Sequence, residues 1–564
     1  MRPMAAFMPA VSVMMAESAQ ASSRLPVMAW SHRCLPPRPH LHRTRHRLLC
    51  RARPNDVGDL GLVNKKVFLD ALQCSRLGWF RRAGQIDASK EISDNDLYLM
   101  QLGQQFEQDC LAHMYPEATK VESVKLKKAC KETMELMRDI EAGKVEHDSP
   151  ALCQASFVFN EAVARADVLE YLGDGRWELV EIKCCSEMSS KDYLLDAAYT
   201  AAILNLSGVN IVKASIIAVS MSYRLGMDKK SLFVKCDVSQ DLFGTEDLIT
   251  RSENCPDAIP MPFCKKCPQF QTCFEKDLKN PIWQLPRLTG SRFDQVAAHG
   301  LEVRVVHHVI TPFRAVEMPQ IEKVPPTLLT KDQLKFYESV MKKEVIVDVR
   351  KLKQHLQETK GPFLYLDFES INPLYPWFDD LAPWQPMITQ FSLHKRADVD
   401  SELQHMEFLA DAKADFRLDL CDYLLECLGD QGSIFVYSSF EKTHLKAFAQ
   451  RFPSRAQQIE EVISRLFDLE KATQQTIPTP GAYPFFFLSV TLPVLVPSYQ
   501  SAYKEMSIKN GFEASSAFQR LRIADAEESK EIRKNLKDYC ALDTLAMVEL
   551  HSAILAISGN SAKL

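Results

Sequence analysis

The stretch from Phe363 to Ser370 constrains the fold more than any other part of this chain. It reads FLYLDFES and follows a Gly-Pro pair, a composition typical of a buried strand. Side chains alternate across a strand, so we expect Asp367 and Glu369 on the same face. Two adjacent carboxylates repel each other unless a cation lies between them, and oxygen ligands of this kind suit Mg²⁺ or Mn²⁺. For this pair taken alone, a strand ending at a solvated edge is the alternative.

The length of 564 residues predicts two or three domains, because a single core does not extend that far. Hydrophobic content of 46% and charged content of 25% are those of a soluble globular protein. A net charge of −5 argues against a generally basic nucleic-acid coat, although it allows a local basic groove. No uninterrupted apolar run reaches the roughly 18 residues that span a bilayer, so we expect no membrane association.

Residues 1–55 differ from the rest in composition. They contain nine arginines, no lysine and one acid, Glu17. An arginine-rich, acid-poor leader is typical of an organelle transit peptide, and we favour the chloroplast over the mitochondrion. A disordered basic tail or a wrongly chosen start codon is the alternative. In a reduced compartment, a disulfide framework among the 16 cysteines is not expected.

A β-hairpin is predicted within the first domain, residues 60–280. The runs 164–172 and 176–183 alternate as strands and flank a Gly-Asp-Gly turn. This register places Asp167 opposite Glu181, and Lys183 shares the face of Glu181. The two carboxylates are candidate ligands for Mg²⁺ or Mn²⁺, and the lysine can orient water or stabilise a phosphate. A surface hairpin with a cross-strand ion pair is the alternative.

A C-x₂-C-x₅-C run closes this domain with Cys264, Cys267 and Cys273. Three thiolates in one loop predict zinc or an iron–sulfur cluster with a fourth ligand from elsewhere, and spacing alone does not separate the two. Residues 281–360 contain no motif that suggests a chemical role, and we interpret them as a structural connector.

A second acidic set is predicted in residues 361–560. The run 535–551 has apolar residues at helical spacing, and Tyr539 and Asp543 lie four residues apart on one face. Glu441 follows a buried strand from 432, and Asp468 is an alternative acid. Together with Asp367 and Glu369, these residues predict a two-metal site in which the tyrosine orients water.

The hairpin resembles the PD-(D/E)xK motif of RecB-like nucleases, with Asp167 as the first acid and Glu181-Ile182-Lys183 as the second element. Thr200 stands on the following helix where that family often has Gln. The resemblance implies a [4Fe-4S] cluster on Cys264, Cys267 and Cys273. It implies Cys74 as the fourth ligand, with Cys255 as its competitor and zinc as the alternative metal.

The second acidic set resembles the DEDD (DnaQ-like) 3′–5′ exonucleases in their tyrosine variant. Asp367 and Glu369 match the first motif, and Tyr539 with Asp543 matches the third. The second motif departs from the pattern because it reads Ser-Ser-Phe-Glu, with Glu441 in the position of an Asp. The resemblance implies an α/β protein with a restriction-endonuclease-like domain followed by an RNase H-like domain.

From about residue 65 to 555 the chain resembles a family of uncharacterised two-domain proteins that join these modules. The stretch Thr476–Pro497 breaks the likeness, as an insertion or retained intron sequence. The resemblance implies a metal-dependent nuclease for DNA processing or repair, with DNA favoured over RNA. A catalytically inactive nucleic-acid-binding protein and an iron–sulfur redox sensor that binds nucleic acid are the alternatives.

Overall fold

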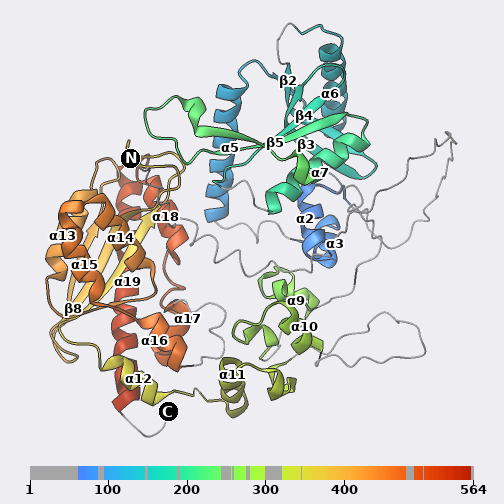
Figure 1. The fold of residues 1–564 in the computed structure, drawn as a ribbon. Coiled ribbons are helices and arrows are strands. Elements are labelled where there is room, and N and C mark those ends of the chain that lie inside the picture. The colour runs from blue at the N-terminus through green and yellow to red at the C-terminus, as the bar shows by residue number, and fades with distance from the viewer. Residues whose placement is uncertain are drawn as a thin grey trace, which may run out of the picture.

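The computed structural model describes residues 61–86, 94–145, 150–186, 191–242, 256, 260–274, 280–298, 320–344, 346–477, 488–499 and 501–559. These residues form an α/β protein with one mixed β-sheet in each half, which confirms the predicted class (Figure 1). The leader 1–55, Cys255 and residues 478–487 of the Thr476–Pro497 stretch lie outside the described residues.

The first sheet contains six strands that follow one another in chain order. They are β1 (Thr119–Lys120), β2 (Ala151–Phe159), β3 (Ala162–Tyr171), β4 (Trp177–Ile182), β5 (Ile211–Val219) and β6 (Phe233–Asp237). Helix α7 (Lys191–Leu206) connects β4 to β5, and this crossover makes the two strands parallel. The pairs β2–β3, β3–β4 and β5–β6 are antiparallel.

The β3–β4 hairpin has the register that the sequence predicted. Val168 pairs with Val180, so the next pair along the ladder is Asp167 with Glu181. The loop turns through Gly173-Asp174-Gly175, all three with positive φ, a conformation that glycine adopts without strain. The hairpin therefore brings the two predicted acids to the same end of the sheet.

Two short helices precede this sheet. Helix α2 (Lys65–Gln73) ends and α3 (Ser75–Arg82) begins at Cys74, whose backbone is extended (φ −157°, ψ 115°). The two helices touch at Gly78, where a Cβ atom would lie 2.5 Å from Cβ of Ala71. Cys74 consequently stands at the corner between them.

Helices cover both faces of the first sheet. Residues of α2, α6 (Leu126–Glu141) and α7 share a core with one face. Helix α5 (Asp94–Met114) packs on the other face through Phe106 and Cys110. A polar side chain on α5 can therefore reach the sheet end that carries Asp167.

The second sheet has the strand order β11-β10-β7-β8-β9. Its strands are β7 (Phe363–Ile371), β8 (Met387–Arg396), β9 (Gln404–Leu409), β10 (Ser433–Val436) and β11 (Leu466–Asp468). The first three form an antiparallel meander, and β10 and β11 run parallel to β7. The connections to these parallel strands run through helices α13 (Arg417–Leu428), α14 (Phe440–Arg451) and α15 (Ala456–Ser464).

The central strand β7 shows two different faces. Leu364, Leu366 and Phe368 belong to the core that includes residues of α13, α14 and α15. Tyr365 faces the long helix α19 (Ala526–Gly559), where its hydroxyl lies 2.8 Å from Nδ1 of His551. Asp367 and Glu369 continue this second face, as the alternation predicted. The acids therefore point toward α19.

A smaller core is formed by residues that lie between the two sheets in the sequence. Trp283, Phe293 of α10 (Gly290–Ala298) and Phe336 of α11 (Lys331–Lys342) belong to it together with Cys264. The cysteine loop is thus packed against residues of the expected connector.

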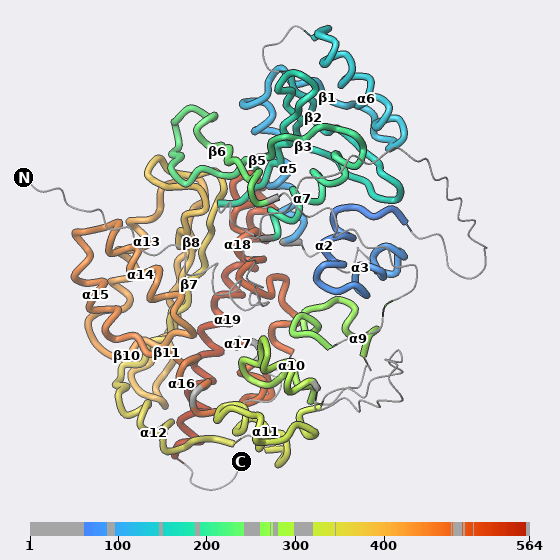
Figure 2. The backbone as a smooth tube through the Cα atoms, turned by 45° about the vertical axis from the view of Figure 1, so that its right-hand side comes forward, coloured from blue at the N-terminus to red at the C-terminus, as the bar shows by residue number. Residues whose placement is uncertain are grey.

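The two halves also contact each other directly. Tyr98 on α5 donates a 2.7 Å hydrogen bond to Gln519 on α18 (Gly511–Arg520), and Figure 2 shows these helices side by side. Tyr375 of the second half donates to Asp109 at 2.6 Å. Leu374 is buried in the core that contains Phe106. These contacts fix α5 against both sheets.

Helix α19 is the one described helix long and apolar enough, by length and composition alone, to cross a membrane. Its inner face packs on β7 and β8 and contributes Leu536, Met547 and Leu550 to the cores. A core helix passes the same test, and this packing is that of a core helix.

The junction between α13 and β10 gives a stability prediction. At Gly432 (φ +86°) a Cβ atom would lie 1.9 Å from the carbonyl oxygen of Pro362, whereas at Gly429 (φ +54°) nothing lies within 4 Å. We expect Gly432→Ala to cost about 2–5 kcal/mol through strain and overlap, and Gly429→Ala about 1–2 kcal/mol through strain alone. Urea unfolding of both variants measures the difference, and equal losses would contradict this packing.

Candidate functional site

Three acids converge where β7 passes α19. Ligand oxygens of Asp367, Glu369 and Asp543 all lie within 4.8 Å of one another. Glu369 is buried, and the other two retain partial exposure. Gly511 lies beside this group, since a Cβ there would be 3.6 Å from Oε2 of Glu369. Carboxylates at this spacing from two rigid elements form an oxygen-rich cradle of the kind that Mg²⁺ or Mn²⁺ occupies.

Glu441 reaches the same region from a helix rather than from a strand end. Strand β10 ends at Val436, and Glu441 lies in the first turn of α14. Its side chain is buried, and Oε2 has no hydrogen-bond partner among the described residues. Asp468 instead accepts a 2.9 Å hydrogen bond from the backbone nitrogen of Lys471 and caps α16 (Leu469–Thr476). Glu441 is therefore the better placed fourth acid.

Two tyrosines and a cysteine surround the acids. Tyr503 donates a 2.6 Å hydrogen bond to Oδ1 of Asp543, and Tyr539 also hydrogen-bonds Asp543. The Cys540 thiol donates to Oδ2 of Asp367 at 3.2 Å. Burial, followed by the charge of Asp543, raises the pKa of Tyr539 far above its ordinary value. Its hydroxyl therefore stays protonated, and its oxygen can still accept a hydrogen bond from a neighbouring water.

The acids repel one another strongly. Burial, followed by the charge of Asp543, raises the pKa of Asp367 well above its ordinary value, and burial and Asp367 do the same to Glu369. Burial raises the pKa of Asp543 to about 6, against the hydrogen bonds from its two tyrosines. Within the described residues, no Lys or Arg forms an ion pair with this cluster. A divalent cation would remove the repulsion, so the donor set fits a metal.

The residues of the first predicted set, Asp167, Glu181 and Lys183, also lie close together. Here a lysine lies among the carboxylates. Asp167 accepts a 2.8 Å hydrogen bond from the backbone nitrogen of Ile182, and Lys183 pairs with Glu181 at 2.9 Å. Burial, followed by the charge of Glu181, raises the pKa of Asp167 to about 8. Burial opposes ionisation of Glu181, but Lys183 and Lys65 hold its pKa at about 2.

Two further residues complete this charge network. Lys65 pairs with Glu181 at 2.9 Å and with Asp196 of α7 at 3.3 Å, and Lys183 pairs with Asp196 at 2.5 Å. Oε1 of Glu181 is buried without a partner among the described residues, which leaves one oxygen for a cation. Thr200 is buried and bonds the carbonyl of Asp196, so its hydroxyl supports α7 rather than the acids.

Sequence reasoning missed Glu107, Lys65 and Tyr503. Glu107 on α5 lies within electrostatic reach of Lys183 and Glu181, and burial raises its pKa. Asp196 lies on α7, the helix that the sequence predicted after the hairpin, so its place near Glu181 could have been inferred. Lys65 and Tyr503 carry no local signal, because their partners lie 40 to 131 residues away. Glu107 carries none because it lies on α5, apart from the hairpin.

The four predicted cysteines line one cavity together with Leu77 and Phe80 of α3. Burial raises the pKa of Cys264 to about 12, and the charges of Cys74, Cys267 and Cys273 act in the same direction. The backbone nitrogen of Met261 lies 3.3 Å from Sγ of Cys264, a contact typical of metal-bound sulfur. The thiol donor set fits a metal or a cluster that joins α3 to the loop after the sheet.

Residues 364–486 match a family described as a domain of unknown function (DUF2779). The match includes Asp367, Glu369 and Glu441 and ends before Tyr539 and Asp543. No curated protein and no solved structure showed significant similarity to the chain.

The buried acids give a stability prediction. Their raised folded-state pKa values mean that the metal-free fold binds protons more tightly than the unfolded chain. The contribution of these acids to the stability of the metal-free fold is therefore fully present below about pH 4 and is lost as the pH rises through 6. We expect Asp367→Asn to raise the metal-free melting temperature at pH 8 by about 2–4 °C per kcal/mol of repulsion removed.

Calorimetry with and without Mn²⁺ checks this prediction. Mn²⁺ should stabilise the unsubstituted protein more than Asp367→Asn, in which only the site at Asp167 and Glu181 stays intact. Asp411→Asn, a change of an exposed acid in the same domain, is the matched control. A lower metal-free melting temperature in Asp367→Asn than in the control would contradict the repulsion.

Proposed function

We propose that this chain is a metal-dependent nuclease that hydrolyses phosphodiester bonds at two sites, and that DNA is its substrate. The observation that supports the proposal best is the convergence of Asp367, Glu369 and Asp543 within 4.8 Å beside the buried Glu441. Organelle targeting through residues 1–55 and a role in DNA processing or repair are part of the same proposal.

Sheet topology supports the finer fold assignments. In the second half an antiparallel meander is followed by two strands parallel to the first, added at its other side. This is the strand order of an RNase H-like fold, in which the central first strand carries the leading acids. In the first half, an antiparallel β2–β3–β4 unit, helix α7 and parallel β5 have the order of a restriction-endonuclease-like core.

The second site suits removal of nucleotides from a 3′ end. Divalent cations held by the four acids would activate water and stabilise the leaving oxygen. The chain itself fixes these acids on β7, α14 and α19, and Tyr503 fixes the carboxylate of Asp543. Tyr539 presents a protonated hydroxyl at the same place, suited to orienting the attacking water.

The first site suits a single metal ion. Asp167 and the free oxygen of Glu181 would hold the cation, and Glu107 is a further ligand candidate. Lys183 stays protonated because, although burial lowers the pKa of the lysine, Glu181 and Asp167 raise it well above the ordinary value. A protonated lysine stabilises negative charge on an attacked phosphate. Lys65 also neutralises Glu181, so part of the positive charge of Lys183 remains available to a phosphate.

The cysteine set suits an iron–sulfur cluster, with zinc as the alternative. Cys74 at the start of α3 and the cysteines Cys264, Cys267 and Cys273 line one cavity, and their four thiols are the complete donor set of a [4Fe-4S] cluster. The cluster would join α3 to the loop 261–274 as a structural element.

End-labelled single-stranded DNA tests the two sites separately. We expect the intact chain with Mn²⁺ to shorten the strand stepwise. Asp367→Asn should remove the stepwise shortening by at least about 100-fold, because the cradle loses a charged ligand. Glu181→Gln should remove any internal cutting and leave the shortening in place. Denaturing gels of both variants and of the double variant measure these activities.

Retention of DNA without cleavage, unaffected by Asp367→Asn, would instead establish a binding protein. Stepwise shortening that persists in Asp367→Asn would place the exonuclease elsewhere in the chain.

Anaerobic purification tests the cluster. The intact chain should be brown and contain about four irons per chain. Cys267→Ala should lose both iron and colour, whereas Cys427→Ala, a partly buried cysteine of the second half, should keep them. Stoichiometric zinc in colourless protein would overturn the cluster.

A further inference from the structure

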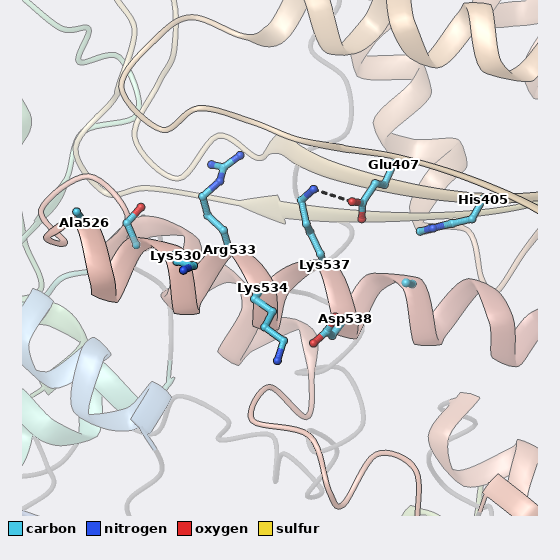
Figure 3. A pocket seen from close by; sticks show the side chains of 10 residues that line it. His405, Glu407, Ala526, Lys530, Arg533, Lys534, Lys537 and Asp538 are labelled. Atoms are coloured by element: carbon cyan, nitrogen blue, oxygen red, sulfur yellow. Dashed lines mark hydrogen bonds and ion pairs between the residues drawn. The ribbon is translucent and has the colours of Figure 1, made fainter.

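A basic groove lies between the first half of α19 and the edge strand β9. It has a volume of about 750 Å³, and Figure 3 shows its side chains. Lys530, Arg533, Lys534 and Lys537 line it from α19, and His405 and Glu407 line it from β9. These four cations stand at i, i+3, i+4 and i+7, so they form one face of the helix. Glu407 and Asp538 are the two acids of the groove. In a chain of net charge −5, such a local concentration of positive charge is distinctive.

The two cations nearest the strand have structural partners. Arg533 donates hydrogen bonds to the carbonyls of Leu409 and Ala410 at 3.1 and 3.0 Å. Lys537 pairs with Glu407 at 2.6 Å. Lys530 and Lys534 are exposed and form no ion pair within the described residues, and Figure 3 shows the Lys534 side chain directed away from the strand. Two ammonium groups are therefore available to an external anion.

The lysines of the groove and the residues Tyr539 and Asp543 of the acid cluster lie on different faces of α19. Successive residues of a helix are rotated by about 100°, so Lys537 and Tyr539 are separated by about 200°. Ile532, Leu536 and Tyr539 face the core, whereas Lys530 and Lys534 face the groove. An anion held in the groove is therefore near the candidate active site along the helix but outside it.

We propose that this groove binds the phosphodiester backbone of a nucleic acid and anchors the substrate polymer at a distance from the metal cradle. From Lys530 to Lys537 the helix rises about 10.5 Å, which is the axial length of about three phosphates on one strand. An array of lysines without an aromatic platform suits sequence-independent contact with phosphates. This inference rests on the proposed nuclease function. The groove would give the polymeric substrate of that nuclease a second contact with the protein.

Salt-dependent binding tests the groove without catalysis. Fluorescence anisotropy of labelled single- and double-stranded DNA in EDTA is measured for the full chain over a KCl series. In Lys530→Ala/Lys534→Ala the loss of two phosphate contacts should lower the slope of log K against log[KCl] by about 1.4 for a single strand. Affinity near 0.1 M KCl should fall about tenfold.

The matched control is Lys127→Ala/Lys131→Ala, an exposed lysine pair with the same spacing on α6. It should leave both slope and affinity unchanged. An unchanged slope in the groove variant, an equal loss in the control, or no binding by the unsubstituted chain would each overturn the proposal. Circular dichroism of the groove variant should match that of the unsubstituted chain.

Cleavage of a small ester separates this inference from the proposed function. The p-nitrophenyl ester of thymidine 5′-monophosphate fits the acid cluster and is too short to reach the groove. With Mn²⁺, the groove variant should hydrolyse this ester at the unsubstituted rate and shorten long DNA several-fold more slowly. Failure of the intact chain on both substrates would overturn the nuclease, while the anisotropy result would still decide the groove.

Discussion

Mutual repulsion of buried carboxylates is the constraint on which the second half of this protein depends. Asp367 and Glu369 are held on the central strand, and Asp543 on the helix packed across it, so none can move apart without disrupting a core. Apolar packing on both faces of β7 supplies the free energy that keeps these charges together. Such an arrangement is typical of a functional site, where local destabilisation is retained for chemistry.

The two candidate sites offset the repulsion between their carboxylates in different ways. In the first half, Lys65 and Lys183 neutralise Glu181 and Asp196 through direct ion pairs. In the second half, the described residues offer the acids phenol and thiol hydrogen bonds, and these only partly offset the charge. The first site is therefore ordered by its own side chains, whereas the second requires an external cation to reach its lowest free energy.

Sequence reasoning succeeded where the relevant distances along the chain are short. Alternation along β7 placed Asp367 and Glu369 on one face, and loop length set the register that pairs Asp167 with Glu181. Cys74 was found through a family resemblance, but the break between α2 and α3 was not, because a corner needs tertiary contacts such as those of Gly78. Tyr503 also escaped prediction, since nothing near it in sequence indicates a partner on α19.

Strand β7 and helix α19 show that the stretch matched by the family is not a closed unit of folding. The stretch that matches the domain of unknown function, 364–486, contains the strands β7 to β11 and the helices on one face. Tyr365, on the opposite face, is covered by His551, and Leu374 is buried against the first half. An excised fragment with those limits would expose both surfaces to water and would be prone to aggregate. The matched stretch is therefore smaller than the body that must fold.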